Sequence, residues 1–400
     1  MMARKPQLRF HWSLPTTGVA NQLRGATSRF QGNPVADLPA QQDFCRQAES
    51  AGIDSMLLPI GFQRPDPITL AGVFGTATKR LTFMVAARSG IVSPTYFVQQ
   101  VNTVAAVTGG RVSVNVVLGH SPAELRYYGD FLDHDDRYRR TDEFWTVCDA
   151  LWRRDFPVSF SGEFVTVEGA QINNQFESAG RARPEVYVSG SSALATQLAV
   201  SHGDSLLCIA EPPRDLAPRI RPALEQGIGV TIVCTQISRP TRAQAVRAAY
   251  RVAEAAGERG KAVQRDFRRA TAESEGFARA YALSDRESPW VMPYLWTGLV
   301  PFMGPPSVAL VGGPDEVTDA IFDYRRIGVT QFLFQGRPDL ETMIFFGREI
   351  LPRIRRREES EHATGGVDRG PGADPVAGPG EFKAAGTSQV GTASEAGGHA

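Results

Sequence analysis

The turn Ser189-Gly190-Ser191-Ser192 stands between a short apolar run and a segment of helical periodicity, and its chemistry suits an anion. Serine hydroxyls and the free backbone N–H groups of a helix's first turn donate hydrogen bonds, and the helix dipole adds positive charge there. A phosphate group is an anion that such a turn can hold. The same residues could instead form only a serine N-cap, which uses one hydroxyl and needs no ligand. The turn alone indicates a candidate phosphate site without deciding for it.

His120 directly follows another apolar run, and histidine is the side chain that titrates near neutral pH. It could hydrogen-bond a substrate carbonyl, or it could be a histidine that only bonds a backbone carbonyl. The sequence contains no G-x-S-x-G elbow, so no Ser-His-Asp triad is inferred. The turn Gly312-Gly313-Pro314 lacks G-x-G-x-x-G spacing, which argues against a dinucleotide-binding unit.

The elements that must position these residues alternate between apolar or β-branched runs and segments of helical period. Eight runs are predicted as strands: Leu8–Leu14, Ile53–Pro59, Leu81–Ala86, Val112–Leu118, Glu185–Val188, Ser205–Ile209, Gly229–Ile237 and Val329–Phe334. Helices are predicted at Pro39–Ala51, Tyr96–Thr108, Asp142–Trp152, Ser192–Ser201, Arg242–Ala256 and Asp315–Ile327. This repeat predicts an α/β fold, a (β/α)8 TIM barrel, because doubly wound sheets usually stop at about five or six strands.

Two segments depart from the barrel repeat. Residues 257–304, before the last strand, are too many for a plain crossover, and we expect added helices and a lid over the barrel mouth. Residues 358–400 are rich in Gly, Ala, Ser and Pro with few large apolar side chains, which predicts a disordered C-terminal tail. We therefore expect one barrel domain over residues 1–357, with the tail after it.

Composition excludes several classes of function. The chain has 400 residues, 42% of them hydrophobic, and its 43 basic and 43 acidic side chains cancel, so nothing favours nucleic-acid binding. No apolar stretch predicts a membrane span or a secretion signal. The four cysteines are scattered and no histidine stands at zinc-ligand spacing, so we expect reduced core thiols, no metal and a cytoplasmic protein.

Several motifs occur together in one order. They are Val85–Thr95 (VAARSGIVSPT), Asn115, Asp133–Trp145 (DHDDRYRRTDEFW), Tyr187–Ser192 (YVSGSS), Trp296–Gly298 and Ala309–Pro314. With this order and spacing, the chain over most of residues 8–357 resembles the bacterial luciferase-like flavin-dependent monooxygenases, and within them the alkanesulfonate monooxygenase branch. The resemblance implies a luciferase-like barrel that binds FMN at its C-terminal mouth.

The resemblance also implies a two-component reaction. A separate NAD(P)H-dependent flavin reductase supplies reduced FMN, which reacts with dioxygen to a flavin hydroperoxide that oxygenates a small organic substrate. Carried over by position, Tyr138, Gly190, Ser191 and Ser192 would hold the FMN phosphate. The residues implied to lie against the flavin ring are Ile60, Gly61, Ala87 and Asn115. Relatives of this kind are dimers or tetramers, so a homo-oligomer is expected.

The pocket departs from the sulfonate branch at several positions. Arg64 replaces a Cys, Val233 and Thr235 replace an Arg and a His, Met303 replaces an Arg, Arg337 replaces a Tyr and Thr17 replaces a His. The losses of cationic groups argue against a simple alkanesulfonate as substrate, unless Arg64 and Arg337 take that role. We expect His120, Arg64, Arg337 and Thr235 nearest the reacting groups. A deazaflavin-dependent hydride-transfer enzyme and a non-catalytic flavin-binding relative are the alternatives.

Overall fold

Eight parallel strands close into a barrel in the computed structural model of the chain, which describes residues 6–15, 38–62, 64–119, 121–178, 180–335 and 339–363. The barrel strands are β1 (Arg9–Ser13), β2 (Ser55–Leu58), β3 (Thr82–Ala87), β4 (Val112–Val116), β7 (Glu185–Ser189), β8 (Ser205–Ile209), β9 (Gly229–Ser238) and β12 (Gln331–Phe334). Each pairs with its neighbour in the order β12-β1-β2-β3-β4-β7-β8-β9, and the pairing of β9 with β12 closes the ring. All eight predicted strands and the predicted (β/α)8 barrel are confirmed.

Strand alternation separates the barrel interior from its outer face. Phe10 and Trp12 of β1 pack against Phe334 and Phe346 in the large core between strands and helices. The intervening residues of each strand face inward, as alternation in a pleated strand requires. The middle of the interior is filled by a separate apolar cluster that includes Leu57, Met84, Tyr187, Leu207, Val233 and Leu333. The barrel is therefore a packed core rather than a pore.

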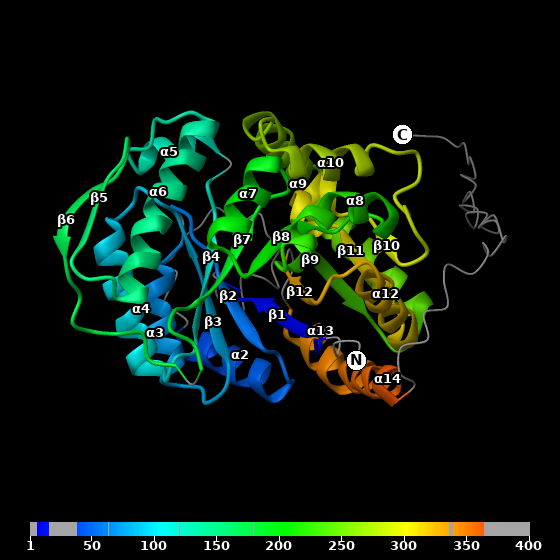
Figure 1. Ribbon diagram of the computed structural model, residues 1–400. Helices are drawn as coiled ribbons and strands as arrows, with labels where there is room; N and C mark the ends of the chain where they lie inside the picture. The colour runs from blue at the N-terminus through cyan, green and yellow to red at the C-terminus, as the bar shows by residue number, and fades with distance from the viewer. Residues whose placement is uncertain are drawn as a thin grey trace, which may run out of the picture.

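Helices surround the strands on the outside (Figure 1). They are α2 (Leu38–Ser50), α3 (Pro67–Gly75), α4 (Pro94–Thr108), α5 (Pro122–Tyr127), α6 (His134–Arg153), α7 (Ala193–His202), α8 (Pro213–Glu225), α12 (Pro314–Arg326) and α13 (Leu340–Phe345). The helices predicted within this set are confirmed, although α6 begins at His134 rather than Asp142 because Asp133 caps it through Asp136 N at 2.8 Å.

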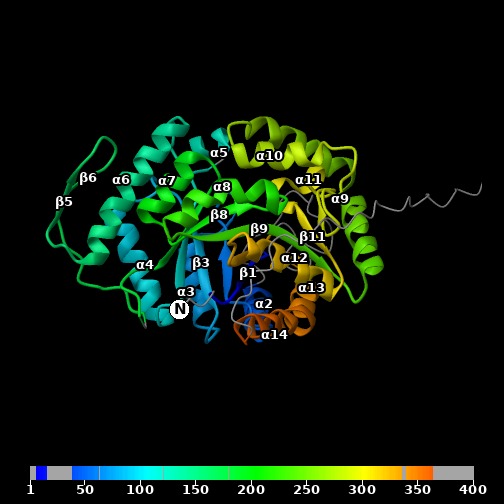
Figure 2. The same ribbon diagram turned by 45° about the vertical axis from the view of Figure 1, so that its right-hand side comes forward.

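Two strand pairs were not predicted. A hairpin of β5 (Val158–Ser161) and β6 (Thr166–Ala170) projects beside α6, at the left of Figures 1 and 2. Strand β9 is longer than the barrel needs, and its second half pairs with β11 (Ala309–Gly312), which in turn pairs with the short β10 (Leu295–Trp296).

The segment 257–304 carries the added helices that its length predicts. Helix α9 (Arg242–Ala270) kinks at Gly257, where φ is 55°, and is followed by α10 (Glu275–Ser284) and α11 (Val300–Met303), with a 3-10 turn at Pro305–Ser307. Figure 2 shows α10 beside α9, above β8 and β9. The insertion thus packs on the barrel, and its role as a lid stays a prediction.

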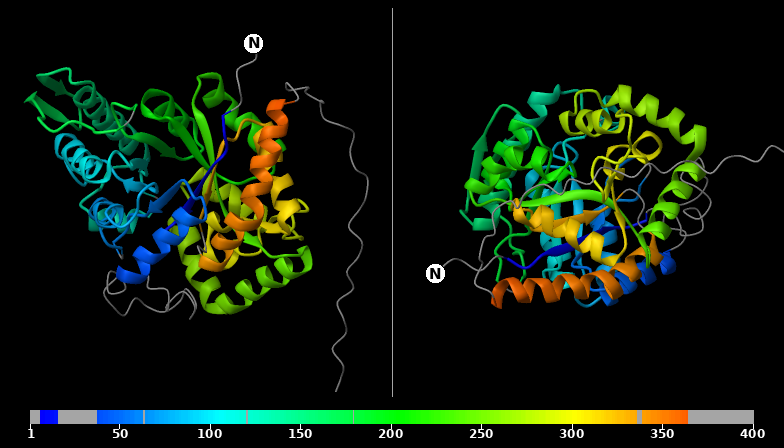
Figure 3. Two further views of the ribbon diagram at one scale, coloured as in Figure 1. Left: turned by 90° about the horizontal axis from the view of Figure 1, so that it is seen from below. Right: turned by 90° about the vertical axis from the view of Figure 1, so that its right-hand side faces the viewer.

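The C-terminal helix corrects the expected domain boundary. A π-helical turn at Phe346–Ile350 leads into α14 (Leu351–Ala363), which runs along the outside of the barrel (Figure 3). The barrel domain therefore does not end at residue 357. The boundary was predicted too early because glutamates such as Glu358 and Glu361 are typical of an exposed tail. In the structure they pair with the buried Arg325 at 3.4 Å and 2.9 Å. Residues 364–400, the rest of the expected tail, lie outside the described residues.

The expectation of core thiols is confirmed in the described part of the chain. Cys45, Cys148, Cys208 and Cys234 are buried free thiols. Among the described helices, none is both long and apolar enough to cross a membrane. The same residues contain no group of histidine, cysteine and acidic side chains that could hold a metal ion.

His11 makes the stability of the barrel depend on pH. Its ring nitrogens bond Ser55 Oγ at 2.6 Å and Gln331 Oε1 at 2.8 Å, and the side chain is fully buried. Burial, and then the charge of Arg9, lower the pKa of His11 from 6.5 to about 4. In the unfolded chain His11 is therefore protonated below about pH 6.5, whereas in the folded protein it is protonated only below about pH 4.

We expect the contribution of His11 to be complete above pH 6.5 and to be lost as pH falls toward 4. The loss in the free energy of unfolding should reach at most about 3 kcal/mol. His11→Gln removes the titrating group, so urea unfolding from pH 7.5 to 4 should depend less on pH than in the wild type. Equal pH dependence in the two proteins would refute this assignment.

Candidate active site

The predicted site residues come from the carboxyl ends of the strands, where barrel enzymes carry their active sites. Ile60 and Gly61 follow β2, Ala87 ends β3, Asn115 lies near the end of β4, and Ser189 ends β7. Because neighbouring strands pair in register, Asn115 stands opposite Ala86 on one side and Tyr187 on the other. The fold therefore brings these segments to one end of the barrel.

Tyr138, Gly190 and Ser192 lie together, as predicted. Tyr138, in the second turn of α6, places its hydroxyl 3.4 Å from Ser192 Oγ, and Ser192 caps α7 by accepting from Ala195 N at 3.2 Å. Gly190 has φ 149°, and a β-carbon there would lie 2.6 Å from Ala195 Cβ and 3.4 Å from the Tyr138 hydroxyl. A side chain at position 190 would thus fill the space that the turn encloses.

The charge state of Tyr138 suits an anion. Burial raises the pKa of its phenol above the ordinary value of 10, so the hydroxyl keeps its proton and can donate. At the start of α7, the N–H groups of Ala193 and Leu194 have no carbonyl partner within the helix. Two hydroxyls, free N–H groups and a helix N-terminus form a donor set that fits a phosphate group.

Ser191 has a neighbour that the sequence did not predict. Arg279 of α10 donates to Ser191 Oγ and to the Ser191 carbonyl, the latter at 3.3 Å. Arg279 in turn pairs with Glu211, a buried residue that follows β8. No sequence signal identifies Arg279, because the contact depends on how the insertion folds back onto the turn after β7.

Asn115 is buried at the inner face of β4. Its side-chain oxygen accepts from Ser189 Oγ at 2.7 Å, which fixes the amide at the end of the strand. Ile60 packs against the interior apolar cluster below it. The described part of the chain therefore offers one fixed amide above an apolar floor, an environment that suits a flat heteroaromatic ring.

Thr235 does not support the catalytic role expected for it. The side chain is fully buried, and its hydroxyl donates to the Gln335 carbonyl at 2.7 Å. Its backbone N–H bonds Val308 O at 2.8 Å, at the point where β9 leaves the barrel to pair with β11. The single hydroxyl proton of Thr235 is therefore committed to holding β9 and the end of β12 together.

Arg64 is the one remaining predicted site residue within the described part of the chain. Arg64 is exposed at the mouth, with its aliphatic chain 3.5 Å from where a β-carbon on Gly61 would stand. Nearby, the buried Arg88 pairs with Glu124 at 2.7 Å, an ion pair that sequence reasoning missed although Arg88 stands within a quoted motif. His120 and Arg337 lie outside the described residues, as does Thr17.

Residues 8–331 match the family model described as luciferase-like monooxygenase. The chain belongs to this family. The luciferase-like protein is therefore an enzyme of the flavin-dependent monooxygenase and oxidoreductase kind, as its motifs indicated.

Solved structures share the fold of the luciferase-like protein at low sequence identity. EDTA monooxygenase from Chelativorans sp. BNC1 is 19% identical with a TM-score of 0.67, covering 88% of this chain and 94% of that one. The oxygenating constituent of 3,6-diketocamphane monooxygenase of Pseudomonas putida, in complex with FMN, is 18% identical with a TM-score of 0.62, covering 87% and 99%. Coenzyme F420 dependent tetrahydromethanopterin reductase from Methanopyrus kandleri is 16% identical with a TM-score of 0.61, covering 87% and 100%.

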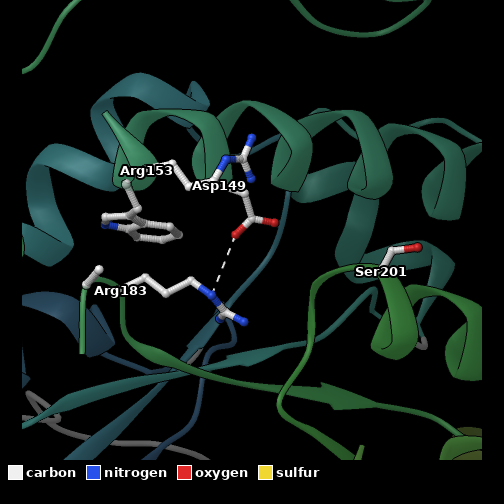
Figure 4. A pocket seen from close by; sticks show the side chains of 6 residues that line it. Asp149, Arg153, Arg183 and Ser201 are labelled. Carbon is white, nitrogen blue, oxygen red and sulfur yellow. Dashed lines mark ion pairs between the residues drawn. The ribbon is translucent and has the colours of Figure 1, made fainter. Parts of the chain in front are cut away.

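A separate cavity of about 330 Å³ lies away from this end of the barrel. Figure 4 shows Asp149 of α6 paired with Arg183, with Arg153 and Ser201 also at the cavity. Arg183 precedes β7, and Asp149 and Ser201 stand near the C-terminal ends of their helices, so the cavity belongs to the amino-terminal side of the barrel. This side of a barrel serves stability rather than chemistry.

Proposed function

We propose that the luciferase-like protein is a reduced-FMN-dependent monooxygenase that uses dioxygen to oxygenate a small organic substrate. The observation that carries this proposal is the cradle formed by Tyr138, Gly190 and Ser192 at the start of α7. Its donors match the three acceptor oxygens of a terminal phosphate, and the missing side chain at Gly190 leaves room for that group. FMN is the flavin that ends in such a phosphate.

The ring of the flavin would lie over the barrel mouth. Asn115, held by Ser189, would face it, together with Ala87 and the backbone of Ile60 and Gly61. The bound flavin supplies the redox chemistry with dioxygen. The protein's residues orient the ring and exclude water, and the insertion 257–304 would close over the mouth to do so.

The pocket composition supports a substrate other than a simple alkanesulfonate. Val233, which stands where the sulfonate branch carries a cationic residue, lies in the apolar cluster of the barrel interior. Burying an ionised sulfonate against such side chains would be costly. Arg64 at the rim, and Arg337, remain the candidates for contacts with a polar part of the substrate.

Partners follow from the same proposal. Reduced FMN must be supplied, so the proposed partner is a separate NAD(P)H-dependent flavin reductase. The proposed assembly is a homo-oligomer. A cytoplasmic location agrees with the free thiols of the buried cysteines.

Deazaflavin-dependent hydride transfer is the second candidate. The similarity to a coenzyme F420 dependent reductase supports it, since that enzyme shares the barrel. A non-catalytic flavin-binding relative is the third candidate. Reductase-coupled oxygen consumption separates the three, because only the monooxygenase consumes dioxygen in step with substrate.

Flavin binding tests the proposal directly. We expect anaerobically reduced FMN to bind the purified protein more tightly than oxidised FMN or a deazaflavin. Tyr138→Phe and Ser191→Ala should each weaken FMN binding roughly tenfold, because each removes a donor to a charged group. Tyr127→Phe, at an exposed tyrosine, should leave binding unchanged. Preference for the deazaflavin would favour hydride transfer, and failure to bind any flavin would refute the proposal.

A further inference from the structure

Arg279 joins the insertion to the turn that we propose holds the flavin phosphate. It stands in α10, 88 residues after Ser191, and its Nη2 donates to both the carbonyl and the hydroxyl oxygen of Ser191. The turn after β7 is thus contacted by a helix that the plain barrel repeat does not contain.

Two carboxylates fix the direction of the Arg279 guanidinium. Its Nε donates to Glu211 Oε1 at 3.0 Å, and its Nη1 donates to Glu275 Oε2 at 3.2 Å. The Glu211 side chain is only 5% exposed and also accepts from Arg219. A planar guanidinium held on two edges has little freedom, so Nη2 stays directed at Ser191.

The contact between Arg279 and Ser191 limits the direction in which the Ser191 hydroxyl can donate. A hydroxyl has one proton, and Arg279 can only donate, so Ser191 Oγ acts as acceptor toward α10. On the same side, a β-carbon on Gly276 would lie 2.8 Å from Ser191 Oγ, which shows how closely α10 approaches. The Ser191 proton is therefore directed away from α10 and remains available as a donor.

We propose that Arg279 is a positioning residue for the cofactor phosphate, and that α10 thereby completes the phosphate site. This inference rests on the proposed function, because it takes the turn at Ser191 as the phosphate site. Arg279 would orient the Ser191 hydroxyl toward the phosphate, while Glu211 and Glu275 balance its own charge. A purely structural ion pair would contribute to stability without distinguishing flavins that differ only in the phosphate.

The comparison of FMN with riboflavin isolates the phosphate. The dissociation constants of both flavins, reduced anaerobically, should be measured for the wild type, Arg279→Gln and Arg279→Lys. We expect Arg279→Gln to weaken FMN binding roughly tenfold with riboflavin binding unchanged, and Arg279→Lys to fall between it and the wild type. Arg219→Gln is the matched control, since it removes the other arginine on Glu211 without touching Ser191.

Gly276→Ala tests the same contact without removing charge. The added methyl group would displace Ser191 Oγ, while alanine suits a helix better than glycine does. We expect the same selective loss of FMN binding in a protein that folds normally. Gly72→Ala in α3 adds a methyl group with nothing within 4 Å, and should change neither flavin.

Two outcomes overturn the inference, and a third overturns the proposed function on which it rests. Equal weakening of FMN and riboflavin in Arg279→Gln would indicate a general disturbance of the site. Unchanged FMN binding in both Arg279→Gln and Gly276→Ala would show that Ser191 does not depend on α10. A wild type that binds FMN no better than riboflavin would instead refute the phosphate site of the proposed function itself.

Discussion

The free energy of unfolding of the Glu358→Ala variant should be about 3–5 kcal/mol lower than that of the wild type. Glu358 lies in α14, is 4% exposed, and accepts from Leu8 N at 2.6 Å and Arg355 Nη1 at 2.7 Å. It also pairs with Arg325, whose side chain is 2% exposed. Removing the carboxylate leaves a buried cation and a buried backbone N–H with fewer partners, which is the costly way to break a buried pair.

Glu359 provides the control for this prediction. It is the neighbouring residue of the same helix, has the same charge, and is exposed. Urea unfolding of Glu359→Ala should agree with the wild type within about 0.5 kcal/mol. A loss below about 1 kcal/mol in Glu358→Ala would show that α14 does not hold the first strand in place.

The barrel strands were predictable because burial on both faces gives parallel strands continuous apolar sequences. Strand β9 is an example in which all nine residues from Val230 to Ser238 are buried and five of them are Val, Ile or Cys. The β5–β6 hairpin was not predicted, since its burial alternates weakly and most of its residues face solvent. Helix α8 was missed because Pro218 and Pro222, which stand inside it, indicate a break in sequence.

Some contacts of the candidate site could likewise be predicted from the sequence, and others could not. Tyr138, Gly190 and Ser192 were placed together by the resemblance to the luciferase-like family, and in the structure each lies near the start of a helix. Arg279 could not be placed, since its contact with Ser191 joins two segments through the path of the insertion. The hydrogen bond from Thr235 could not be predicted for a similar reason, since position along a strand does not reveal that its hydroxyl donates to the Gln335 carbonyl.

Gly190→Ala should have the largest effect on the cofactor site. The backbone at Gly190 is fixed by β8, because its N–H bonds Leu207 O at 3.0 Å and its carbonyl accepts from Cys208 Sγ at 3.3 Å. The turn therefore cannot move away from the 2.6 Å overlap with Ala195 Cβ, and φ 149° adds backbone strain. We expect FMN binding to weaken by roughly two orders of magnitude, as α7 shifts and both hydroxyl donors are lost.

The overlap itself can be relieved, which separates it from general damage. Adding Ala195→Gly to Gly190→Ala removes the atom that the new methyl group would meet, leaving only the strain in φ. The double variant should regain part of its FMN affinity, although glycine in the first turn of α7 costs up to about 1 kcal/mol in stability. Titration with FMN decides the point. If the double variant binds no better than Gly190→Ala, then the contact with Ala195 is not what keeps position 190 free of a side chain, and the space at the start of α7 is not shaped for the phosphate.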